Sequence, residues 1–309
     1  MQLLVSGGAG FLGSHLIDDL VSKGENVTVV DNLSTIKHLY LPEKGVKLVK
    51  EKVENFDSSE KFDFVIHLAA RPSPEDYMNN PVDTALSNSL GTQKLLEIAR
   101  KNDATFVYTS SSEVYGNPSI VPTPEDYWGF VNPIGVRSCY DESKRFSEAL
   151  IMAYHRQYNL DVRIQRPFNV YGPRLREDGT YGRVVSRFIY QALKGEDITI
   201  FGDGSQTRAF LYIDDWVDAT ERIIFTEGLS GEVFNVGSDK ETKIIDLAKL
   251  ILRVSNSRSM IKFLPSRVDD PPRRAADLHK IKEKLGWYPK TSLEEGIKKT
   301  VEWFGGAIN

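Results

Sequence analysis

The sequence predicts an α/β fold, with a doubly wound parallel sheet followed by a smaller second domain. Three observations lead to this prediction. Short apolar runs alternate with helical patterns through the first half of the chain, and a glycine-rich turn joins the first run to the first helix. After Pro173 the alternation gives way to loops rich in Gly, Asp and Arg. Strands that alternate with helices form parallel sheets with helices on both faces.

Five apolar runs are predicted to be strands, because each is short, rich in β-branched or aromatic residues and bounded by polar residues or glycine. They are residues 2–6, 27–31, 62–67, 105–109 and 162–165. Helices are predicted from the glycine-rich turn to about Gly24, over 85–101 and from Tyr140 onward. In the last of these helices, the spacing predicts that five residues face the core, namely Phe146, Ala149, Leu150, Ala153 and Tyr154.

Composition limits the classes of function. The chain has 309 residues and a net charge of −4 with mixed signs, so neither nucleic acid nor an anionic membrane is expected as a main partner. A single cysteine, Cys139, excludes an internal disulfide and a cysteine-based metal site, and the five histidines show no ligand spacing, so no metal is expected. Residues 1–6 lead directly into a strand and no apolar stretch has the length of a membrane span, so we expect a cytoplasmic protein without a signal peptide.

The glycine-rich turn predicts a dinucleotide site. Gly7, Gly10 and Gly13 follow a strand and open a helix, with the spacing G-x-x-G-x-x-G. Glycine lets the backbone turn tightly and approach a pyrophosphate, whose charge then lies at the helix N-terminus. We expect Phe11 and Leu12, which lie in the same turn, to contribute to this site.

The ends of the next two strands add to the cofactor site. Asp31 ends the second strand, where a carboxylate binds the ribose hydroxyls of NAD and repels the 2′-phosphate of NADP, so NAD is favoured. Asn32 is assigned to the same site. Ala69 is a small residue after the third strand, where the chain can pass close to the cofactor. His67, just before it, is interpreted as a packed histidine rather than a catalyst.

Tyr140 and Lys144 are the candidate proton-transfer pair. Their i, i+4 spacing places both side chains on one face of a helix. A phenol next to an ammonium group has a lowered pKa, and a phenolate can take a proton from a sugar hydroxyl. The spacing alone is weak, because it also occurs in solvated surface pairs. Here it coincides with the glycine-rich turn and with the polar stretch 110–113, and together these features favour a catalytic pair.

With these motifs in order, the chain resembles the extended short-chain dehydrogenase/reductase family of nucleotide-sugar epimerases, dehydratases and decarboxylases. Five stretches resemble its UDP-glucuronate decarboxylase branch: residues 125–135, 139–145, 182–188, 204–210 and 269–274. The resemblance implies a Rossmann-type domain over residues 1–170, which also receives 211–237, and a smaller C-terminal α/β substrate-binding domain mainly over 171–309. It also implies bound NAD, a UDP-sugar substrate and a homodimer formed through helices near 90–101 and 144–157.

The resemblance also implies roles for single residues. Ser111 hydrogen-bonds the reacting sugar oxygen beside Tyr140, and Asn88 supports the active site. Four further residues bind the substrate: Asn169 and Arg208 hold the diphosphate, Arg183 is a further diphosphate candidate, and Arg274 meets the sugar carboxylate. One position departs from the family, because Lys52 stands where an aspartate commonly reads the adenine.

The triplet Ser111-Ser112-Glu113 separates the possible reactions. In all these enzymes the resemblance implies that the tyrosine takes the C4 hydroxyl proton while NAD⁺ takes the C4 hydride. Dehydratases carry Thr-Asp-Glu, but Ser112 is too weak an acid to expel water, whereas simple 4-epimerases usually lack the glutamate. A retained Glu113 without the aspartate favours decarboxylation of UDP-glucuronate to UDP-xylose through a 4-keto intermediate. A UDP-sugar 4-epimerase, a dTDP-glucose 4,6-dehydratase and a catalytically silent NAD-binding sensor stay open as alternatives.

Overall fold

The computed structural model describes residues 1–176, 183–266 and 271–308. These residues form two compact units. The first unit comprises residues 1–114, 131–166 and 217–234. The second unit comprises residues 115–130, 167–216 and 235–309. Each unit is therefore assembled from segments that are distant in the sequence, and each is described here by itself.

The first unit is built on a seven-stranded sheet with the order β11-β6-β5-β4-β1-β2-β3. These strands are β1 Gln2–Ser6, β2 Asn26–Val30, β3 Val46–Val49, β4 Phe64–His67, β5 Thr105–Thr109, β6 Val162–Pro167 and β11 Glu232–Val236. The strands β1 to β6 pair in parallel, and the winding reverses between β1 and β4. The predicted doubly wound α/β fold is confirmed.

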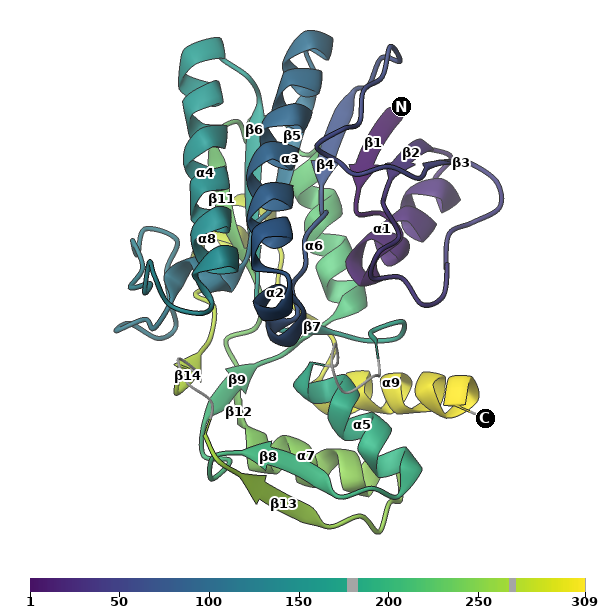
Figure 1. The fold of residues 1–309 in the computed structure, drawn as a ribbon, viewed down its shortest axis with the longest axis vertical. Helices are drawn as coiled ribbons and strands as arrows, with labels where there is room; N and C mark the ends of the chain where they lie inside the picture. The colour runs from purple at the N-terminus through teal and green to yellow at the C-terminus, as the bar shows by residue number, and fades with distance from the viewer. Residues whose placement is uncertain (177–182, 267–270, 309) are drawn as a thin grey trace. The chain divides into compact units, whose positions relative to one another are not determined.

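Helices cover both faces of this sheet, as parallel strands require. They are α1 Phe11–Ser22, α2 Pro74–Asn79, α3 Pro81–Asn102, α4 Ser138–Tyr158 and α6 Ile213–Phe225. Figure 1 shows α3 and α4 side by side over one face. On the other face, the guanidinium of Arg163 in β6 donates to the carbonyl oxygens of Ile223 and Ile224 in α6, at 2.7 and 2.8 Å.

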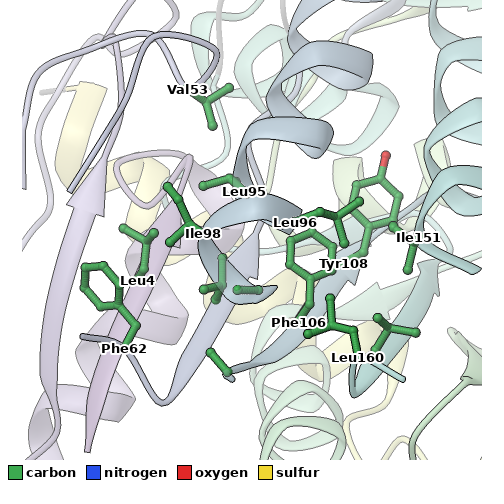
Figure 2. Packing of buried hydrophobic residues seen from close by; sticks show 14 of the residues in the cluster. Leu4, Val53, Phe62, Leu95, Leu96, Ile98, Phe106, Tyr108, Ile151 and Leu160 are labelled. Atoms are coloured by element: carbon green, nitrogen blue, oxygen red, sulfur yellow. The ribbon is translucent and has the colours of Figure 1, made fainter. Parts of the chain in front are cut away.

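The core of the first unit lies between the sheet and the pair α3 and α4. Apolar side chains from alternate strand positions, such as Leu4, Phe106 and Tyr108, are fully buried against Leu95 and Leu96 of α3. Figure 2 shows this packing, with side chains from the strands and from α3 interleaved. Burial of this kind stabilises the unit by about 1.5–3 kcal/mol for each large apolar side chain, and it fixes the strand ends that carry the candidate site.

The predicted core face of α4 was wrong for Phe146, whose side chain is 52 % exposed, and for Ala149, which is also exposed. Leu150 and Tyr154 are partly buried against the core, and Ala153 is intermediate. The buried face of α4 instead carries Tyr140, Asp141, Ser143, Lys144, Ser147 and Ile151.

Hydrogen bonds to α3 explain this choice of face. Asn88 of α3 donates to Ser143 Oγ at 2.9 Å, and Ser147 Oγ donates to the Asn88 carbonyl oxygen at 2.8 Å. Because these bonds satisfy the buried hydroxyl groups of Ser143 and Ser147 and the amide nitrogen of Asn88, the polar face can pack inward while Phe146 is exposed.

The second unit contains short strands and four helices among its described residues. The strands are β7 Val170–Tyr171, β8 Ile198–Phe201, β9 Thr207–Ala209, β10 Leu211–Tyr212, β12 Glu241–Lys243, β13 Ile261–Leu264 and β14 Arg273–Arg274. The helices are α5 Val184–Lys194, α7 Ile244–Val254, α8 His279–Leu285 and α9 Leu293–Ile308. In the small sheet β12-β9-β14, β9 lies in the centre. A search of the described helices found no segment with the length and apolarity of a membrane span.

Candidate active site

Two glycines of the segment that joins β1 to α1, Gly7 and Gly13, have no room for a side chain. Gly7 adopts φ +70°, and a Cβ at this position would lie 2.5 Å from the backbone nitrogen of Ala69. A Cβ at Gly13 would lie 2.6 Å from the carbonyl oxygen of Gly7. Helix α1 follows with Gly10 as its N-cap and no acidic residue in its first turn, where Phe11 and Leu12 lie. A bare backbone at a helix N-terminus is suited to a pyrophosphate.

Asp31 lies directly after β2, beside this turn. One carboxylate oxygen accepts a hydrogen bond from Ala9 N at 3.1 Å, and the other accepts one from Leu33 N at 2.8 Å. Burial raises the pKa of Asp31, and these two backbone donors oppose the rise. Each oxygen of an ionised carboxylate has a second lone pair, so hydroxyl donors such as those of a ribose fit here. The neighbouring Asn32 accepts from Ser34 N at 2.9 Å.

Lys52 is part of a network of ion pairs. Its ammonium lies 3.1 Å from an oxygen of Asp83. Asp83 also pairs with Arg71, which in turn donates to both carboxylate oxygens of Asp76. Sequence reasoning missed Arg71, because its partners occur at no recognisable motif spacing. The network fixes the chain that follows β4.

Tyr140 and Lys144 lie on one face of α4, as predicted, and the structure shows that this face is buried. The Lys144 ammonium donates to the Thr109 carbonyl oxygen at 2.8 Å and lies 5.9 Å from the centre of the Tyr140 ring. Burial lowers the pKa of Lys144 to about 7. The Tyr140 ring stacks on Tyr77 of α2, with ring centres 5.1 Å apart and planes 10° apart. A cation this close to a phenol favours the phenolate that proton abstraction requires.

His67, at the end of β4, is packed rather than exposed. It is fully buried, and its Nδ1 is 2.7 Å from Ser6 Oγ. Burial, with a further contribution from the Lys144 charge, lowers the pKa of His67 well below its usual value. His67 is therefore neutral at physiological pH and adds no positive charge to that of Lys144.

The predicted triplet follows β5. Ser111 Oγ accepts a hydrogen bond from Glu113 N at 3.2 Å, at the start of the short helix η1 Ser112–Tyr115. The Glu113 carboxylate forms an ion pair with Arg137, the residue that precedes α4. Sequence reasoning missed Arg137 and also Tyr77, because both act through contacts between segments distant in the chain. Asn88 donates a hydrogen bond to Ser143, which lies between Tyr140 and Lys144 in α4. This contact is consistent with a residue that supports the active site.

The second unit holds the other predicted residues. Asn169 donates to the Ala209 carbonyl oxygen at 2.9 Å. The guanidinium of Arg183 lies 3.4 Å from the carbonyl oxygen of Val170. Arg208 and Arg274 occupy the same register position in the parallel pair β9 and β14, and both are buried. Arg208 donates to the Thr207 carbonyl oxygen at 2.8 Å. The guanidinium of Arg274 lies 3.4 Å from the carbonyl oxygen of Gly116. Two buried arginines at one register position are suited to binding an anionic ligand, because a guanidinium forms paired hydrogen bonds with phosphate and carboxylate groups.

Gly182, Asp269 and Asp270, which belong to two of the stretches that carry the resemblance, lie outside the described residues. Within the parts of the chain that the structure describes, no three His, Cys, Asp or Glu side chains are arranged to hold a metal ion.

Comparisons with known proteins place this geometry in a family. Residues 3–237 match the NAD dependent epimerase/dehydratase family. UDP-glucuronic acid decarboxylase 1 of Danio rerio is 44 % identical over 98 % of this chain and 72 % of the relative. UDP-glucuronic acid decarboxylase 3 of Arabidopsis thaliana is 44 % identical over 100 % of this chain and 90 % of the relative.

Solved structures share the fold over the whole chain. UDP-glucose 4-epimerase of Thermotoga maritima, solved with UDP-glucose, superposes with a TM-score of 0.93 at 35 % identity, covering 100 % of both chains. UDP-glucuronic acid 4-epimerase of Bacillus cereus, solved with UDP-glucuronic acid and NAD, superposes with a TM-score of 0.89 at 31 % identity, covering 99 % of this chain and 100 % of the other.

Proposed function

Because this chain belongs to the NAD dependent epimerase/dehydratase family, we propose that it converts UDP-glucuronate to UDP-xylose and carbon dioxide. The observation that carries the proposal is the nearly full-length similarity to UDP-glucuronic acid decarboxylases. The triplet agrees with it, because Glu113 is present and Ser112 replaces the acid that water loss would need. The enzyme is a lyase that uses NAD as its cofactor.

The first unit supplies the cofactor site and the proton transfer. The bare turn at Gly7, the open first turn of α1 and the Asp31 carboxylate fit a dinucleotide. Bound NAD would accept the hydride from C4 of the sugar and, after carbon dioxide has left and C5 is protonated, would return it to C4, so that the product is UDP-xylose rather than a 4-keto sugar. Tyr140 as phenolate takes the C4 hydroxyl proton, Lys144 stabilises the phenolate, and Ser111 hydrogen-bonds the same sugar oxygen. General acid–base groups of this kind contribute about 10²–10⁴-fold to rate.

Loss of carbon dioxide follows from the chemistry of the oxidised sugar. With a ketone at C4, the C6 carboxylate belongs to a β-keto acid. The C5–C6 bond breaks, carbon dioxide leaves, and the electron pair passes to the ketone oxygen to give an enol. A proton then returns to C5. We assign Glu113 the task of orienting the ring or the water that delivers this proton.

The second unit supplies cationic groups for the substrate. We assign Arg208, with Asn169 and Arg183, to the diphosphate, and Arg274 to the sugar carboxylate before it leaves. The shared register position of Arg208 and Arg274 supports these roles, because a guanidinium forms paired hydrogen bonds with phosphate and carboxylate groups.

The exposed face of α3 and α4 supports a homodimer. Val82, Leu86 and Leu90 recur along α3 at helical spacing and are exposed, as is Phe146 of α4. Exposed apolar side chains on two adjacent helices fit a four-helix interface with a second copy. Light scattering of the protein and of Leu86→Glu tests this part of the proposal. The cytoplasmic location expected from the sequence is also part of the proposal, and fractionation of expressing cells tests it.

One incubation tests the function. Purified protein with UDP-glucuronate and NAD⁺ should release carbon dioxide and form a UDP-pentose. Conversion of UDP-glucose to UDP-galactose, with no carbon dioxide from UDP-glucuronate, would instead identify a 4-epimerase. Release of a 6-deoxy-4-keto sugar would identify a dehydratase and show that Ser112 does not block that route.

A further inference from the structure

Arg137 contacts both Tyr140, which is assigned the C4 hydroxyl proton, and Glu113, which is assigned to the protonation of C5. Its carbonyl oxygen accepts hydrogen bonds from Tyr140 N at 3.0 Å and from Asp141 N at 3.1 Å, which begin helix α4. Its guanidinium pairs with the Glu113 carboxylate in η1. The main chain of Arg137 therefore fixes Tyr140, and its side chain holds Glu113. All three residues belong to the first unit.

The charges around Arg137 argue against a direct role in binding substrate. Asp141, one turn into α4, places a second carboxylate oxygen 4.0 Å from the Arg137 guanidinium. The side chains of Arg137 and Glu113 are only 15 % and 18 % exposed. An ion pair with this burial is screened less than one at the surface. The two carboxylates beside Arg137 already outweigh its single positive charge, so they would repel a substrate carboxylate. Arg274 is therefore the better candidate for binding that carboxylate.

Tyr77 faces the same group from α2. Burial raises the pKa of Tyr77, the charge of Arg137 opposes the rise, and Glu113, Asp141 and Tyr140 add to it. Tyr77 therefore stays neutral and acts through its ring, which stacks on Tyr140. The groups that face this cluster from three elements are thus Glu113 of η1, Asp141 of α4 and Tyr77 of α2.

We propose that Arg137 is a positioning residue that holds Glu113 as a carboxylate beside Tyr140. The inference rests on the proposed decarboxylase function. A neighbouring guanidinium favours the ionised carboxyl, so Glu113 accepts hydrogen bonds and orients water. It does not itself donate the proton that C5 receives. The water that Glu113 orients supplies that proton, and the hydroxide left behind takes up the proton that the enol oxygen releases as the ketone re-forms.

Four variants test this assignment: Arg137→Met, Arg137→Lys, Glu113→Gln and the double variant Arg137→Met/Glu113→Gln. For Arg137→Met we expect the kcat of carbon dioxide release to fall at least ~10-fold, as for loss of a charged hydrogen bond, with KM for UDP-glucuronate nearly unchanged. Arg137→Lys should recover part of the loss. In the Glu113→Gln background the Arg137→Met change should add almost nothing, because its partner is gone. Arg156→Met, an exposed arginine of the same helix, is the matched control.

Two kinetic results would overturn the assignment. A raised KM with unchanged kcat that persists in the Glu113→Gln background would mean that Arg137 binds substrate. Equal losses in both backgrounds without recovery by lysine would mean that Arg137 only stabilises the fold.

A substrate-free readout separates this inference from the proposed function. Thermal unfolding of the four variants should show a smaller fall in Tm for Arg137→Met when Glu113 is already glutamine. If the wild-type protein releases no carbon dioxide, the proposed function fails, yet this Tm cycle still decides whether Arg137 and Glu113 are coupled. Additive Tm changes would reject the coupling.

Discussion

The two units hold their candidate residues in different ways. In the first unit, groups of opposite charge or complementary polarity meet: Glu113 pairs with Arg137, and Asn88 bonds Ser143. In the second unit, two residues of like charge, Arg208 and Arg274, share a register position across β9 and β14. The hydrogen bonds given above for these arginines end on main-chain carbonyl oxygens, Thr207 for Arg208 and Gly116 for Arg274.

This difference separates two tasks of an enzyme. The first unit is preorganised for proton transfer, since its groups are positioned before substrate arrives. The second unit places two buried cationic residues at one register position, an arrangement suited to binding an anion. Substitutions in the proton-transfer groups of the first unit should therefore change kcat, whereas substitutions among these arginines should change substrate affinity. The predictions below test this division.

The largest effect is expected for Tyr140→Phe. The change removes the hydroxyl that takes the C4 proton, while the ring still stacks on Tyr77. Turnover should fall at least ~10²-fold, as for the loss of a general acid–base, whereas NAD affinity should change little. Carbon dioxide release and calorimetry measure the two quantities. Turnover within a few-fold of wild type would remove Tyr140 from the mechanism.

A smaller effect, on affinity, is expected for Arg274→Ala. Only UDP-glucuronate carries the carboxylate, so its affinity should fall by roughly ten- to a hundredfold, the range for a hydrogen bond between charged groups. UDP-xylose affinity should hardly change. Arg273→Ala is the matched control, because Arg273 is the neighbouring residue of β14 but is exposed and paired with Glu241. Equal losses for both ligands would assign Arg274 to the diphosphate or to folding.

A smaller change is expected in the preference for NAD over NADP when Asp31 is substituted. Wild-type protein should prefer NAD to NADP, and Asp31→Ala should narrow this preference by removing both hydrogen bonds to the ribose and repulsion of the 2′-phosphate. Because Asp31 also anchors Ala9 and Leu33, Asp31→Asn is the companion variant that keeps an acceptor and removes the charge. Calorimetry with both cofactors measures the change. Equal wild-type affinities would show that Asp31 does not face the ribose.

The same contrast explains what the sequence could predict. Tyr140 and Lys144 were predictable because helix geometry alone fixes an i, i+4 pair, and the glycine turn because its backbone tolerates no side chain. Arg137 and Tyr77 were not predictable, since their roles arise from contacts between η1, α2 and α4 that no local spacing encodes.

The inward face of α4 was misjudged because the apolar side chain of Phe146 was expected inside. Hydrogen bonds to α3 instead let polar Ser143 and Ser147 pack there. Helix α2 was also not predicted.

The last prediction concerns stability rather than catalysis, and it rests on Lys144, a buried cation whose charge, unlike that of the arginines in the second unit, can be lost near neutral pH. Its pKa is lowered from 10.5 to about 7 by burial. Between these values the unfolded chain binds more protons than the folded one, so stability should rise with pH across this window and level off below it. Relative to Lys144→Met, the slope should reach at most ~1.4 kcal/mol per pH unit. Urea unfolding without added cofactor measures it, with exposed Lys298→Met as control. If the difference in unfolding free energy between Lys144→Met and wild type does not vary with pH, the ammonium is not desolvated. Tyr140 and Lys144 would then not form a preorganised proton-transfer pair.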